Sequence, residues 1–111
     1  MKKTVLSAAS CYNKKYYIDP DMEKSLPSQI KEELKAITAS KAEKIHCVFI
    51  IGFYENGDIY IETMNNENDF DFDEIGSRLE IEKIKKEKAE LLKSLSLWYK
   101  TYGIKLSVQN E

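Results

Sequence analysis

Three aspartates alternate along an acidic stretch and could hold a hard cation. Asp69, Asp71 and Asp73 lie two residues apart, and Glu80 follows eleven residues after Asp69. These spacings match positions 1, 3, 5 and 12 of a calcium-binding loop, whose oxygen ligands suit a divalent cation. The glycine that such a loop needs at position 6 is Glu74 instead. The opposing interpretation is a solvated acidic segment without a metal, with Glu80 used to cap a helix, and we expect no cofactor.

A second group of residues surrounds a turn and could bind a ligand. It combines basic and aromatic side chains, namely Tyr12, Lys14, Lys15 and Tyr16. Such a combination can stack on bases and contact phosphates in single-stranded nucleic acid. However, the chain has 17 Lys and Arg residues against 19 Asp and Glu, a formal net charge of −2, and this balance argues against nucleic acid. A pocket between this turn, Gly52 and Tyr60 is the alternative, and it would indicate a small-ligand binder or a small enzyme.

The soft metal ligands and nucleophiles are few. Cys11, His46 and Cys47 are the whole set of cysteines and histidines, whereas a structural zinc site needs four ligands at recognisable spacing. His46 and Cys47 are adjacent, so in a strand their side chains point to opposite faces and cannot form a nucleophile–base pair by themselves. Cys11 and His46 could instead meet across strands. Two cysteines are also too few for a disulfide scaffold. With no apolar run near the roughly 20 residues of a membrane span, we expect a cytoplasmic protein without a membrane segment.

Four β-prone segments can position these groups, at residues 3–11, 16–18, 45–54 and 59–64. The third is apolar on both alternating faces, which is typical of a central strand. Asn56-Gly57 predicts a two-residue type I′ turn between the third and fourth segments. That turn would place Phe53 opposite Tyr60 and leave a gap at Gly52 for a helix or a ligand.

Two helices are predicted, over about residues 27–43 and residues 78–102. Ser77 and Glu80 match a capping box at the start of the second helix. A heptad-like seam follows along this helix, consisting of Ile81, Ile84, Lys88, Leu91, Leu95, Trp98 and Tyr102.

The long second helix carries the leading functional expectation. At roughly 25 residues it would span about 37 Å, more than the neighbouring strands. Its seam covers the protein's own sheet in the simplest interpretation, and the overhang would be free for a second copy or another protein. We therefore expect an interface at Leu91, Leu95, Trp98 and Tyr102. On the exposed side, Glu82 with Lys86 and Glu90 with Lys93 have the spacing of intrahelical ion pairs.

Several stretches together resemble a family of small, uncharacterised proteins of Firmicutes, classed as a domain of unknown function. These stretches are residues 10–18, 26–35, 68–70, 72–77, 87–95 and 98–100. The resemblance extends to about residue 102 and implies a bacterial, cytoplasmic setting. It implies no activity, ligand or catalytic residue.

Residues 1–111 are therefore expected to form one α+β domain. We predict two layers, a mainly antiparallel sheet of four or five strands and two helices in the order ββαββα, with residues 104–108 as the optional last strand. If residues 16–18 are not a strand and residues 104–108 are, the order becomes the ferredoxin-like βαββαβ. The expected function is a non-enzymatic protein-interaction module, with a homodimer or another protein as its partner.

Overall fold

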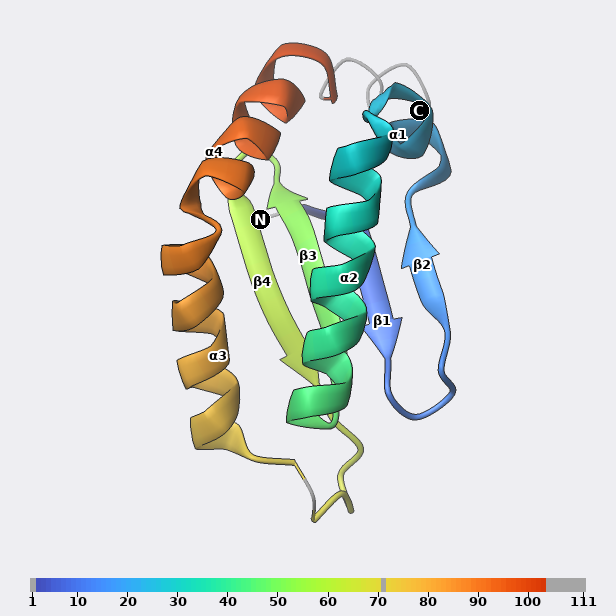
Figure 1. The fold of residues 1–111 in the computed structure, drawn as a ribbon, viewed down its shortest axis with the longest axis vertical. Helices are drawn as coiled ribbons and strands as arrows, with labels where there is room; N and C mark the ends of the chain where they lie inside the picture. Colours follow the sequence, from blue (N-terminus) through green and yellow to red (C-terminus); the bar gives the residue numbers. More distant parts are fainter. Residues whose placement is uncertain (1, 71, 104–111) are drawn as a thin grey trace.

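The computed structural model describes residues 2–70 and 72–103, which form an α+β fold (Figure 1). In chain order the elements are β1 (Lys3–Ser10), β2 (Tyr16–Ile18), α1 (Pro20–Ser25), α2 (Ser28–Ile45), β3 (Val48–Tyr54), β4 (Ile59–Met64), α3 (Glu74–Glu87), α4 (Ala89–Trp98) and the π-helix η1 (Tyr99–Gly103). The predicted order ββαββα is confirmed, with two differences. A short helix α1 precedes α2, and the second predicted helix is divided.

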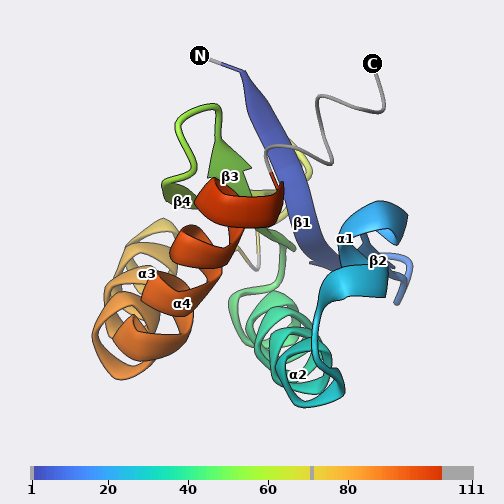
Figure 2. The ribbon, with the colours of Figure 1, turned by 90° about the horizontal axis from the view of Figure 1, so that it is seen from above.

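The four strands form one antiparallel sheet in the order β2-β1-β3-β4. β3 lies inside the sheet, as its two apolar faces predict, and Phe49, Ile51 and Phe53 are fully buried. Figure 2 shows α2, α3 and α4 on the same side of the strands. The prediction of two layers is therefore confirmed.

The ferredoxin-like alternative is wrong. It required that residues 16–18 not be a strand, but β2 pairs with β1 and places Tyr16 opposite Ala9. The expected fifth strand at 104–108 lies outside the described residues.

The turn between β3 and β4 differs from the predicted type I′ turn. The Tyr54 amide donates to the Asp58 carbonyl over 2.7 Å, and the Gly57 amide donates to the Tyr54 carbonyl over 2.9 Å. The loop therefore has three residues, and its left-handed position is Gly57, with φ 95°. Because the loop is one residue longer than expected, Phe53 lies opposite Ile59 rather than Tyr60.

Gly52 lies opposite Tyr60, on the face of the sheet that points away from the helices. A Cβ atom at Gly52 would collide with the Thr4 carbonyl oxygen and with the Tyr60 ring. The space predicted at Gly52 is thus filled by the ring of its cross-strand neighbour. Tyr60 itself is buried.

Helix α2 packs on the sheet through a polar contact as well as an apolar one. Ser7 on β1 is fully buried, and its hydroxyl lies 2.9 Å from the Thr38 hydroxyl of α2 and 2.9 Å from the Tyr16 hydroxyl of β2. Thr38 also donates to the Leu34 carbonyl within its own helix. Burial of these hydroxyls is tolerated because each has a partner.

The predicted continuous helix over residues 78–102 is broken at Lys88, which has φ −111° and ψ 24°. Lys88 occupies a position of the apolar seam, but its side chain is 40% exposed. The break lets its Nζ reach the Glu33 carboxylate of α2, 3.1 Å away. We call α3, α4 and η1 together the arm.

The arm also begins earlier than predicted. Asp73 is the N-cap of α3, and its carboxylate accepts a hydrogen bond from the Gly76 amide. Ser77 is buried, with its hydroxyl 3.1 Å from the Thr63 hydroxyl of β4, so the predicted capping box of Ser77 and Glu80 is wrong. Ser77 cannot be the N-cap because the helix already begins at Glu74, and the Ser77 amide donates to the Asp73 carbonyl over 2.8 Å.

Candidate functional site

The predicted interface residues lie mostly on the side of the arm that covers the sheet. Leu95 is 1% exposed, and Leu91 and Trp98 pack against the core. Tyr99 stacks on Phe53 of β3, with ring centroids 4.0 Å apart. Of the four residues expected to form an interface, Tyr102 is the exposed one, at 61%. The seam thus completes the core of the single chain.

The opposite side of the arm carries a second line of residues, which the sequence analysis missed. All of them are exposed and follow one another at spacings of three or four: Ile75, Leu79, Glu82, Lys86, Glu90, Lys93 and Leu97. On a helix this spacing places side chains on one face. Each helix turns its buried residues inward, Ser77 and Ile84 in α3 and Leu95 in α4, so this line points away from the sheet. We call these seven residues the outer stripe.

The outer stripe is apolar at its ends and charged in its middle. Leu79 is 65% exposed and Leu97 is 58% exposed. The charged side chains between them are Glu82, Lys86, Glu90 and Lys93. Among the contacts of the described residues, neither of the two ion pairs expected within the helix is formed. These four charges are therefore available to a partner.

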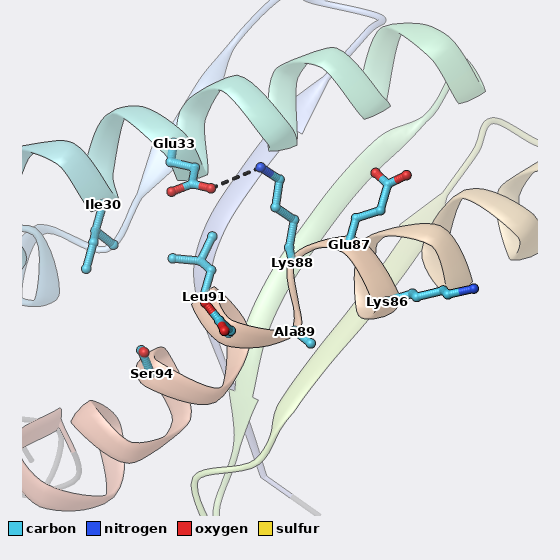
Figure 3. Close-up of a pocket in the computed structure, with 9 residues that line it drawn as sticks. Ile30, Glu33, Lys86, Glu87, Lys88, Ala89, Leu91 and Ser94 are labelled. Atoms are coloured by element: carbon cyan, nitrogen blue, oxygen red, sulfur yellow. Dashed lines mark hydrogen bonds and ion pairs between the residues drawn. The ribbon is translucent and has the colours of Figure 1, made fainter.

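A groove of about 650 Å³ lies between α2 and the α3–α4 junction (Figure 3). Ile30, Leu91 and Ala89 supply apolar walls. Lys88 reaches toward Glu33, whereas Lys86 points away from α2. Lys88 and Glu33 neutralise each other, whereas Lys86, Glu87 and Glu90 also line the groove and add charge to it.

Nearer the start of α3, Glu80 links this helix to α2 by ion pairs. Its two carboxylate oxygens each lie 2.7 Å from an ammonium group, Lys41 on one side and Lys44 on the other. Hydrogen bonds from these two lysines lower the pKa of Glu80 from 4.5 to about 2. Glu80 therefore serves packing between helices.

The other residues of the predicted calcium site have separate partners or are not described. Asp73 caps α3, Asp69 bonds to His46 and Tyr12, and Asp71 lies outside the described residues. Within the described part of the chain, no group of three or more His, Cys, Asp or Glu side chains could hold a metal ion.

The predicted ligand-binding residues lie in three places. Tyr16 faces α2 through Ser7, and Gly52 with Tyr60 lies on the opposite face of the sheet. The other predicted residues lie in the β1–β2 turn or beside it. Lys14 there pairs with Glu43 over 2.6 Å and has a left-handed backbone, with φ 57°. The six residues do not surround a common cavity, although Lys15 and Tyr16 both line a hollow of about 360 Å³.

A cluster at the end of the sheet joins three segments that are far apart in sequence. The Asp69 Oδ2 atom accepts a hydrogen bond from the Tyr12 hydroxyl over 2.6 Å and lies 2.7 Å from His46 Nδ1. The Tyr12 hydroxyl is also 3.2 Å from the His46 carbonyl oxygen. Burial, followed by the bond to Asp69, raises the pKa of Tyr12. Such a carboxylate orients the imidazole, an arrangement shared by general bases and by structural clips.

The neighbouring thiols do not complete a nucleophilic site with this imidazole. The Cys11 amide donates to the Cys47 carbonyl over 3.1 Å, and both cysteines are buried. Burial raises the pKa of Cys47 to about 12, and burial also raises that of Cys11, so both thiols stay protonated. The cluster is therefore best described as a clip that holds the loop after β4. The sequence could have indicated this cluster only through the strand pairing, because the antiparallel pairing of β1 with β3 places the end of β1 beside the start of β3.

No helix in the described residues is long and apolar enough to cross a membrane.

Comparisons with known proteins identify a family and nothing further. No curated protein and no solved structure matches the chain. The model of a family of unknown function, DUF6145, matches residues 3–107. Because this match spans well over half of the 111 residues, the chain belongs to the DUF6145 family.

Proposed function

We propose that this chain is a protein-interaction module that forms a homodimer through the outer stripe of its arm. The proposed dimer contact uses the same helical segment as the predicted interface, but it lies on the side opposite to the seam. Leu95 is buried, and Leu91 and Trp98 are half-buried against the chain's own core, so the proposal uses the exposed side instead.

The observation that supports this proposal is the distribution of exposed large hydrophobic side chains. Among the described residues there are seven such side chains, and four belong to the arm: Ile75, Leu79, Leu97 and Tyr102. Exposed apolar groups on one regular element favour contact with another protein over binding of a small molecule, which needs a concave site.

The proposal is tested with Leu79→Glu and Leu97→Glu. Each variant places a carboxylate in the contact, where loss of solvation is costly. By multi-angle light scattering at about 50 µM, above the Kd of a dimer held by about 8 kcal/mol, we expect the native chain at twice its 12.9 kDa mass. Both variants should have the monomer mass and an unchanged circular dichroism spectrum.

Met64→Glu is the matched control. Met64 is 58% exposed, as Leu97 is, and lies on β4 outside the arm. It should leave the dimer intact. A monomeric native chain, or dimeric Leu79→Glu and Leu97→Glu variants, would contradict the proposal.

We place this module in a reducing compartment such as the bacterial cytoplasm. Cys11 and Cys47 are both free, although they are hydrogen-bonded neighbours just beyond the paired ends of β1 and β3. Buried free thiols are common in reducing compartments, where disulfides are rare. Fractionation of cells that express the tagged chain tests this placement, and recovery in the membrane or secreted fraction would contradict it.

A further inference from the structure

We infer that the two copies pack their arms antiparallel, with the two-fold axis beside the α3–α4 break at Lys88. This inference rests on the proposed homodimer and adds the register of the contact. In a two-fold contact, residue i of one copy meets residue j of the other, and residue j meets residue i in return. In an antiparallel pair, the outer stripe of one copy must therefore be complementary to the same stripe running in the opposite direction.

The stripe meets this requirement around Lys88. Leu79 lies nine residues before Lys88 and Leu97 nine residues after it, so these two apolar side chains meet across the axis. Both are more than half exposed in the single chain. The contact covers the apolar ends of both arms.

The charged middle of the stripe is complementary in the same register. Lys86 lies two residues before Lys88 and Glu90 two residues after it, so an ammonium group meets a carboxylate. Glu82 and Lys93 lie six residues before and five residues after the break, and they form the next opposite pair. Two-fold symmetry produces each of these pairs twice.

A parallel arrangement of the two arms fails on the same residues. Each side chain would then lie near its own copy, with Lys86 facing Lys86 and Glu90 facing Glu90. Like charges brought together at an interface disfavour association. The intrahelical pairing that could have neutralised these charges is not formed among the described residues. Opposite charges on a partner are therefore favoured, and the antiparallel register supplies them.

The position of Lys88 itself is consistent with this register. Lys88 points toward α2 and pairs with Glu33, whereas Lys86 points away from α2 (Figure 3). The charge of the residue at the axis is thus paired within its own chain, so it does not need a partner on the second copy.

The inference is tested by exchanging the central charges. Lys86→Glu and Glu90→Lys each create like-charge contacts twice per dimer, so we expect the Kd from sedimentation equilibrium to rise about tenfold or more for each variant. The double variant restores opposite pairs in reversed order, and its Kd should return to within about threefold of the native value. Lys85→Glu changes the charge by the same amount at an exposed position beside the stripe, and it should leave the Kd within about twofold.

The outcomes separate this inference from the proposed function. If Leu79→Glu and Leu97→Glu are monomeric but the single charge variants dimerise normally, the outer stripe is the interface and the antiparallel register is wrong. A double variant that is as weak as the single variants also overturns the register. If the native chain is monomeric, the proposed function fails and this inference fails with it.

Discussion

The inner and outer sides of the arm are both apolar in part, yet they have different roles. On the inner side, Ile84, Leu95 and Tyr99 are between 1% and 3% exposed and belong to the core. On the outer side, Leu79 and Leu97 are exposed at the ends of a charged line. An apolar repeat in a helix therefore identifies a surface that will be covered, but the topology decides whether the chain's own sheet covers it. Here the sheet covers the inner side, and the outer side stays exposed in the single chain.

The largest expected effect is a difference in the free energy of unfolding between substitutions on the inner side and on the outer side of the arm. Leu95→Ala removes a buried side chain next to the sheet, so the free energy of unfolding should fall by about 2–4 kcal/mol. Leu97→Ala removes the same atoms from an exposed site and should cost less than about 0.5 kcal/mol in the monomer. Urea unfolding at concentrations where the chain is monomeric measures both. Equal losses in the two variants would show that the sides are not different.

The second-largest effect concerns the Asp69 clip, which we expect to stabilise the fold as the inner side of the arm does. Asp69→Asn weakens the bonds to Tyr12 and His46 around a side chain that is 7% exposed. We expect a loss of about 1–2 kcal/mol in unfolding free energy. Glu67→Gln neutralises an exposed acid in the same loop and is the control. If both variants cost the same small amount, Asp69 does not hold the loop.

The smallest effect concerns the tie between α2 and α3. The folded pKa of Glu80 is about 2, below its ordinary value of 4.5. Its ion pairs with Lys41 and Lys44 thus stabilise the fold fully above about pH 4.5, and the stabilisation is lost as the pH falls toward 2. Glu80→Gln should cost about 1 kcal/mol at pH 7 and much less near pH 2. Thermal unfolding at both pH values measures this convergence, and a cost that does not change with pH would contradict the account.

The sequence predicted the elements better than their ends. The apolar runs of β3 and the helical spacing of α2 were sufficient because burial on two faces or on one stripe leaves a periodic signal. The turn after β3 was misjudged by one residue, since Asn56-Gly57 fits both a two-residue loop and a three-residue loop. Only the pairing of Tyr54 with Asp58 distinguishes them.

Tertiary contacts explain the remaining differences. At the break, Lys88 pairs with Glu33 on another helix, 55 residues away in sequence, and this contact leaves no local signal. Likewise, Ser77 has the right type to cap a helix but faces Thr63 instead. The outer stripe was visible in the sequence as Ile75, Leu79 and Leu97, yet the stronger inner seam concealed it. Its importance follows from exposure, which requires the fold.

The mass of the native chain in solution tests the central claim most directly. Sedimentation equilibrium between about 1 and 100 µM covers the range in which an association of about 6–8 kcal/mol is visible. We expect a concentration-dependent rise from 12.9 kDa toward twice that mass. A mass of 12.9 kDa throughout this range would contradict it.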